Sequence, residues 1–163
     1  MTTESIEQLL VEGVQELYYT EQQQIDALET LAEETGIQAA SHAFASHREE
    51  TETQVQRLEQ VFEALGEKPE AREDIVVTAM IDEHDQFAGA NDGEVLDRYN
   101  MAMGQKTEHY EIAAYGNLAS LAEKTGHDEA AELLVETLRE EQDALDELTA
   151  ASERFDEQQI ASD

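Results

Sequence analysis

The chain has 163 residues, of which 40 are Asp or Glu and 9 are Lys or Arg, so its formal net charge is -31. A surface this acidic repels the phosphate backbone of nucleic acids, and without salt to screen it the charge also opposes compact folding. Apolar residues still make up 40% of the chain. We therefore expect one folded domain spanning residues 1–163, from a halophilic cell whose salt screens the charge.

The composition also excludes several chemistries. Cysteine is absent, which excludes disulfides, thiolate zinc sites and a rubredoxin-like electron-transfer module. No uninterrupted apolar run approaches the roughly 20 residues that span a bilayer, and the first ten residues lack a basic region followed by an apolar core. We expect a cytoplasmic protein without membrane or nucleic-acid partners, in which oxygen and nitrogen atoms hold any metal.

Apolar residues recur three and four positions apart, which predicts five helices. The first helix is expected to begin near Ser5, whose spacing to Gln8 is that of a capping box, and to end near Thr35 with Gly36 as the residue after the cap. The fourth is expected to begin after Asn91 or Asp92, since Asn91 and Glu94 have capping spacing, and to reach residue 125. The others are predicted at about 38–65, 71–87 and 128–155.

Four of these helices are long and the third is short. Long helices joined by short turns pack as antiparallel neighbours. The sequence therefore predicts an all-α fold, an antiparallel four-helix bundle with one additional short helix in the crossover between the second and third long helices.

Acidic residues on the apolar stripes of these helices are the informative ones, because most of the others solvate the surface. Each long helix brings at least one carboxylate onto its stripe, and the second also brings a histidine with a carboxylate at the stripe's edge. The predicted metal ligands are Glu21, His47, Glu50, Glu108, Glu111 and Glu141.

Several carboxylates buried together repel one another and take up protons unless a cation compensates them. Carboxylates and imidazoles from facing bundle helices are the ligands of paired iron or manganese ions, often with two ligands three residues apart. Glu108 with Glu111, and His47 with Glu50, have that spacing. The alternative is that, in so acidic a chain, chance places glutamates on helix faces and each of them is a surface residue.

The remaining candidates have simpler interpretations. His42, His84 and His127 are predicted at the surface or at helix ends, and His109 on the side away from Glu111. The methionines at 80, 101 and 103 are predicted to pack in the core. Three tyrosines either hydrogen-bond metal ligands or serve as core aromatics, namely Tyr18, Tyr110 and Tyr115.

Two segments, HREETETQVQRLEQVFEALGEKP (47–69) and TEHYEIAAYGNLASLAEKTGHDEAAELLVETLREE (107–141), resemble the YciE/YciF family of ferritin-like proteins, and the likeness extends from ELYYTEQQ (16–23) onward. HYEIAAYG is also similar to the rubrerythrin helix that carries two ligand glutamates three residues apart, here Glu108 and Glu111. Glu21 stands where the first-helix ligand would be. The resemblance implies a five-helix ferritin-like fold, often dimeric, with a di-iron centre and a stress-associated role, but no established reaction.

The chain departs from the ferritin-like ligand pattern in two helices. The usual second-helix order of Glu followed three residues later by His is absent, and His47 precedes Glu50 instead. In the last helix Glu140 is followed three residues later by Asp143. Whether Glu49, Glu140 or Asp143 replaces one of the predicted ligands stays open at this point.

Three functions follow from these patterns. The leading one is a homodimeric protein with two metal ions, iron or manganese, that detoxifies dioxygen or peroxide or oxidises ferrous iron. Glu108 and Glu141 are the expected bridges between the ions. An unidentified electron donor would reduce the metal centre. The second is a metal-free structural or stress-response bundle. The third is a storage or DNA-protecting cage, and the acidic surface argues against its DNA binding.

Overall fold

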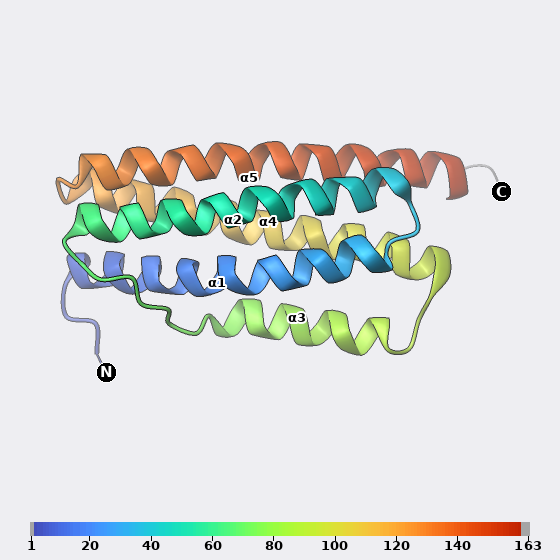
Figure 1. Cartoon of the computed structure of the whole chain (residues 1–163), viewed down its shortest axis with the longest axis horizontal. Coiled ribbons are helices and arrows are strands. Elements are labelled where there is room, and N and C mark those ends of the chain that lie inside the picture. The colour runs from blue at the N-terminus through green and yellow to red at the C-terminus, as the bar shows by residue number, and fades with distance from the viewer. Residues whose placement is uncertain (1, 161–163) are drawn as a thin grey trace.

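The computed structural model describes residues 2–160, which form five α-helices and a terminal π-helical turn (Figure 1). No β-strand occurs within this range. The elements are α1 (Ile6–Glu34), α2 (Gln38–Leu65), α3 (Ile75–Ala88), α4 (Gly93–Lys124), α5 (Asp128–Phe155) and the π-helical turn Asp156–Ile160. The all-α prediction is confirmed.

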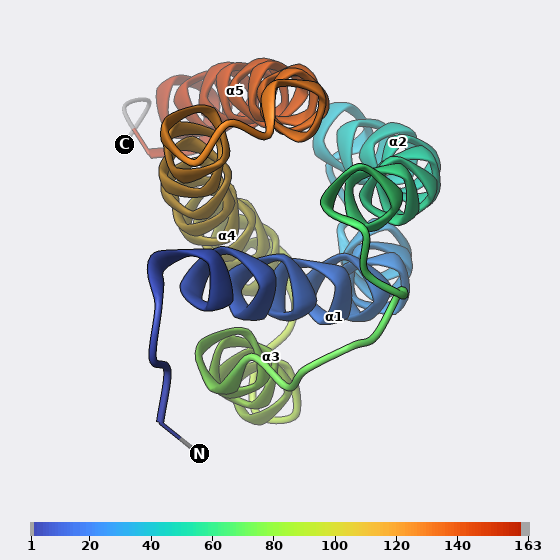
Figure 2. The same ribbon diagram turned by 90° about the vertical axis from the view of Figure 1, so that its left-hand side faces the viewer.

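The four long helices pack side by side into an elongated bundle, and α3 lies outside it (Figures 1 and 2). Short loops join α1 to α2 and α4 to α5, so each pair is antiparallel. The crossover from α2 to α4 carries α3 along the side of the bundle formed by α1 and α4. The structure thus confirms the antiparallel four-helix bundle of ferritin-like type with a short extra helix in the crossover.

Polar side chains determine where several helices begin. The Ser5 hydroxyl accepts a hydrogen bond from the Gln8 N–H (3.0 Å), as its capping spacing predicts. The start predicted for α3 near residue 71 is wrong, because the Asp74 carboxylate accepts from the N–H groups of Val76 and Val77 and caps the helix there. The Asn91 cap is also wrong, since its amide donates to the carbonyl of residue 87 (2.9 Å).

Glycines with positive φ end α2 and α4. Gly66 (φ 73°) and Gly126 (φ 82°) adopt the left-handed conformation, which glycine reaches without steric cost. Gly36 follows the cap residue Thr35, as predicted, but it lacks the left-handed conformation, because the chain leaves α1 in an extended conformation at Thr35. The Gly36 N–H instead donates to Asp97 Oδ1 (2.7 Å), which ties the α1–α2 loop to α4.

Two apolar clusters fill the core, one toward each end of the bundle, and a buried polar layer separates them. On α1 the clusters meet the layer at Leu17 and Leu28, and on α2 at Leu58 and Phe44. The layer is therefore sealed from both ends by packed apolar side chains. No helix within residues 2–160 is long and apolar enough to cross a membrane.

Candidate metal centre

Three predicted ligands from three helices meet in the polar layer. His47 of α2 places Nε2 3.1 Å from Glu108 Oε1 of α4 and 3.3 Å from Glu141 Oε2 of α5. One ligand atom of each residue lies within 4.8 Å of the others, and all three side chains are buried. This group is able to hold a metal ion.

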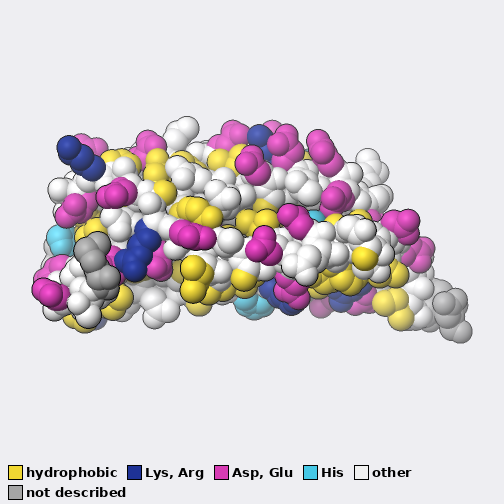
Figure 3. Space-filling model, turned by 90° about the horizontal axis from the view of Figure 1, so that it is seen from below, with side chains coloured by type: hydrophobic (Ala, Val, Ile, Leu, Met, Phe, Trp, Pro, Cys, Tyr) yellow, Lys and Arg dark blue, Asp and Glu magenta, His cyan; other side chains and the backbone are white. Residues whose placement is uncertain are grey.

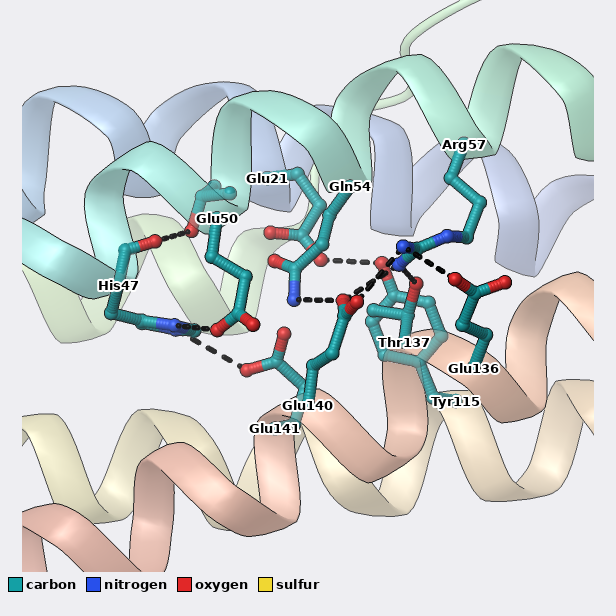
Figure 4. Close-up of polar contacts among 11 residues, drawn as sticks. Glu21, His47, Glu50, Gln54, Arg57, Tyr115, Glu136, Thr137, Glu140 and Glu141 are labelled. Atoms are coloured by element: carbon teal, nitrogen blue, oxygen red, sulfur yellow. Dashed lines mark hydrogen bonds and ion pairs between the residues drawn. The ribbon is translucent and has the colours of Figure 1, made fainter.

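Glu21 of α1 and Glu111 of α4 lie in the same layer, and each is only 1% exposed. The charges of Glu141, His47 and Glu108 act on both of them. Figure 4 shows Glu21 pointing from α1 into the space between α2 and α5. All four long helices thus contribute a buried carboxylate or imidazole to one site.

The electrostatics of the site oppose ionisation of most of these carboxyls. Burial raises the pKa of Glu108 to about 8, although the contact with His47 opposes this rise. Burial raises the pKa of Glu111 well above its usual range, and the charges of Glu21 and Glu141 add to the shift. The pKa of Glu21 is also raised well above its usual range, by burial and then by the charge of Glu141.

His47 and Glu141 behave in the opposite way. Burial alone would lower the pKa of His47, but Glu108, Glu141 and Glu50 stabilise its charged form and raise that pKa well above the usual value. Burial likewise works against ionisation of Glu141, yet the contact with His47 lowers its pKa. In the metal-free chain an imidazolium and bound protons therefore balance the carboxylate charge.

Four buried carboxylate oxygens in the layer have no hydrogen-bond partner within residues 2–160: Glu108 Oε2, Glu111 Oε1 and both oxygens of Glu141. The Glu141 contact with His47 is an ion pair without hydrogen-bond geometry. Each unsatisfied buried oxygen costs about 1–3 kcal/mol. A bound cation would satisfy these oxygens, so the donor set fits a metal site made of oxygen and imidazole ligands.

Glu50 lies on the other side of the imidazole, and its side chain is 39% exposed. Its Oε2 is 3.3 Å from His47 Nδ1, whereas Nε2 faces the buried carboxylates. Metal-binding histidines commonly donate the second ring N–H to a carboxylate, which fixes the tautomer and the ring orientation. The geometry gives Glu50 that orienting position, and direct coordination by Glu50 stays a prediction.

Of the three tyrosines, Tyr115 contacts a predicted ligand. Its hydroxyl donates to Glu21 Oε1 (Figure 4), and burial and the charge of Glu21 raise the pKa of Tyr115 well above its usual value. Tyr115 is thus a phenol that orients Glu21. Tyr18 donates to Glu59 instead, and Tyr110 donates to Asp74 (2.5 Å).

A buried arginine beside the site was not predicted. The Arg57 guanidinium of α2 donates to Glu140 (2.6 and 2.8 Å), Glu136 (3.0 Å) and Thr137 (2.8 Å) of α5. Gln54 also donates to Glu140 (3.1 Å), as Figure 4 shows. Glu140 is therefore engaged outside the centre, while Glu49 and Asp143 are exposed. The sequence did carry one signal for these polar contacts beside the site. Gln54 follows His47 by seven residues, which places both side chains on the same face of α2.

The other histidines lie outside the cluster. His42 and His109 are exposed and His127 is partly exposed at the start of α5, as expected. The surface prediction for His84 is wrong: its ring is buried and its Nε2 lies 3.0 Å from Asn100 Oδ1. Packing of α3 against α4 causes this burial, because the two residues belong to those helices.

Fold and site together define a ferritin-like helical bundle with a buried carboxylate and histidine cluster. The chain belongs to the family described as "Domain of unknown function (DUF892)", whose model matches residues 5–161. Protein YciF of Escherichia coli (strain K12) is 38% identical over 143 residues, which cover 86% of each chain.

Two solved structures of relatives share the fold. The E. coli stress protein YciF aligns with a TM-score of 0.90 at 34% identity, over 96% of this chain and 99% of that one. YcfI from Rhodopseudomonas palustris, provisionally called a structural protein, aligns with a TM-score of 0.88 at 39% identity, over 90% of this chain and 94% of that one. The resemblance inferred from the sequence is thereby confirmed at the level of the family.

Proposed function

We propose that the protein is a di-metal carboxylate protein that serves in a stress response, with iron or manganese in the polar layer. The observation that carries this proposal is the convergence of four unsatisfied buried carboxylate oxygens with the Nε2 of His47. The residues that would hold the metals are Glu21, His47, Glu108, Glu111 and Glu141. The relative called a stress protein supports the biological context.

The chain's own residues would each have a distinct part. Glu108 of α4 and Glu141 of α5 would hold metal together with His47, while Tyr115 would orient Glu21 and Glu50 would orient His47. The apolar clusters above and below exclude water from the layer. Bound iron would supply reactivity toward dioxygen or peroxide, or the oxidation of ferrous ions, and reducing equivalents would come from an external donor.

Metal content is the direct test. Protein purified without chelator, or loaded anaerobically with ferrous iron, is expected to hold about two ions per chain. The double variant Glu108→Ala, Glu111→Ala should lose them. The matched control is Glu29→Ala, Glu33→Ala, which removes the same charge from exposed positions of α1 and should bind like the parent.

A metal-free structural role is the second candidate. It is favoured by the existing ion pairs of His47 with Glu108 and Glu141, which balance part of the charge without a metal. On this alternative, anaerobic loading leaves less than one ion per chain, and addition of chelator does not shift the unfolding temperature. Those results together would end the di-metal proposal.

We also propose that the protein is a homodimer, as the family resemblance implies. Light scattering in high salt should give a mass near twice the 18.2 kDa of the chain. A pure monomer would contradict the dimer, and a mass of many subunits would support the cage alternative instead.

A further inference from the structure

A second feature lies outside the metal centre, between α1, α3 and α4, and opens to solvent. It is a pocket of about 230 Å³. Its walls are mainly apolar, formed by Ala27, Leu31, Val77, Met80, Ile81 and Met103. The family description and the relatives' names assign no role to it.

One polar group in this pocket lacks a partner. Gln24 lines the wall and is only 6% exposed, yet its amide makes no hydrogen bond within residues 2–160. Two other polar side chains of the wall are engaged: Thr107 donates to the Met103 carbonyl (3.0 Å), and His84 contacts Asn100. Gln23 also lines the pocket but is more exposed than Gln24. The Gln24 amide can both donate and accept, so it is the buried group available to a bound molecule.

The charges around the pocket select against ions. Its lining contains no Lys or Arg, and its two carboxylates, Asp26 and Asp85, are exposed at the rim. Figure 3 shows further acidic side chains spread over the face of the bundle that carries α3. Anions are therefore repelled, and a cation drawn to the rim would lose its hydration on entering the apolar interior.

We propose that this pocket binds a small uncharged molecule that is mainly apolar and carries one hydrogen-bonding group, of the size of a substituted single ring. An apolar cavity of about 150 Å³ is enough to take up benzene. The larger volume here therefore accommodates a ring with a polar substituent, whose hydroxyl or carbonyl would pair with the Gln24 amide.

The position of the pocket connects it to the polar layer. Gln24 follows Glu21 by three residues on α1, and Thr107 directly precedes Glu108 on α4. A molecule bound there would lie about one helical turn from the carboxylate cluster. Its use as a substrate or reductant of a metal centre rests on the proposed function, whereas the binding itself does not.

Fluorine NMR titration of 4-fluorophenol into the full chain, with chelator present, tests binding without involving a metal. Saturable binding is expected. Ala27→Leu should abolish it by filling the pocket, while Ala113→Leu, which adds the same volume at an exposed position of α4, should leave it unchanged. No saturable binding to the parent, or equal losses in the two variants, overturns the proposal.

A second variant tests the hydrogen bond and does not depend on filling the pocket. Gln24→Leu keeps a side chain of similar size but removes the amide. The preference for 4-fluorophenol over fluorobenzene is expected to fall about fivefold, the value of one ordinary hydrogen bond. An unchanged preference would show that Gln24 does not recognise the ligand and would refute the proposed chemistry.

Discussion

His47 Nε2 and Glu108 Oε1 face each other across the middle of the bundle at 3.1 Å. The same two atoms would coordinate a metal and, in its absence, form an ion pair. Burial strengthens the need for either the imidazolium or a metal ion, because a carboxylate removed from water requires a positive partner. Protons and metal ions therefore compete for one set of atoms.

Metal affinity is accordingly expected to rise with pH. The pKa values of His47, Glu108, Glu111 and Glu21 are all raised in the metal-free chain, so a metal must displace protons from these groups. Calorimetric titration of manganese between about pH 6 and about pH 8 should show tighter binding and measurable proton release. An affinity independent of pH would contradict the assigned ligands.

The free energy of unfolding of the metal-free protein should fall as pH rises. The pKa of Glu108 rises from 4.5 to about 8 on folding, so its favourable contribution is complete below pH 4.5 and is lost as pH rises toward 8. His47, whose pKa is also raised, loses its contribution in the same direction. Urea unfolding in chelator should give a lower free energy of unfolding at pH 8 than at pH 5.

Glu108→Gln separates this effect from the titration of the surface carboxylates, which both proteins share. The variant cannot ionise at this position, so its stability relative to the parent should increase between pH 5 and pH 8 by on the order of 2 kcal/mol. If the difference between the two proteins stayed constant with pH, Glu108 would not be the titrating group.

Arg57 is expected to matter more for stability than a surface arginine. Arg57→Leu leaves Glu140, whose side chain is 24% exposed, with Gln54 as its remaining donor, which should cost about 2 kcal/mol in the free energy of unfolding. The matched control Arg48→Leu breaks the partly exposed pair with Glu52 and should cost less than about 1 kcal/mol. If urea unfolding gave similar losses of free energy for the two variants, burial of Arg57 would not increase its contribution to stability.

Helical spacing explains which parts of the site were predictable. Residues one position apart on a helix point about 100° apart. The positions of the apolar residues in α5 are therefore enough to predict, from the sequence alone, that Glu141 is buried and Glu140 is not on the same face. The same reasoning finds Glu21, Glu108 and Glu111 on the inner faces of their helices. Local periodicity thus predicted which carboxylates are buried, because it depends on one helix at a time.

The errors concern contacts between helices. The start of α3 depends on Asp74, whose carboxylate also accepts from Tyr110 of α4 and Thr20 of α1, and no local pattern contains that information. The pairing of Arg57 with Glu140 joins positions 83 residues apart. Such contacts are set by how the helices are placed in the bundle, which the period within each helix leaves open.

Tyr115→Phe tests whether the layer is organised around Glu21 as a ligand. The substitution removes the hydroxyl that donates to Glu21 Oε1 but keeps the buried ring in the apolar cluster. Loss of such an orienting partner commonly lowers metal affinity 10–100-fold. Competition with a metal-chelating dye should show that loss, whereas Tyr18→Phe, which breaks a hydrogen bond to Glu59 away from the layer, should bind like the parent. Equal affinities of Tyr115→Phe and the parent would mean that Glu21 does not coordinate the metal, and the centre would then consist of ligands from α2, α4 and α5 alone.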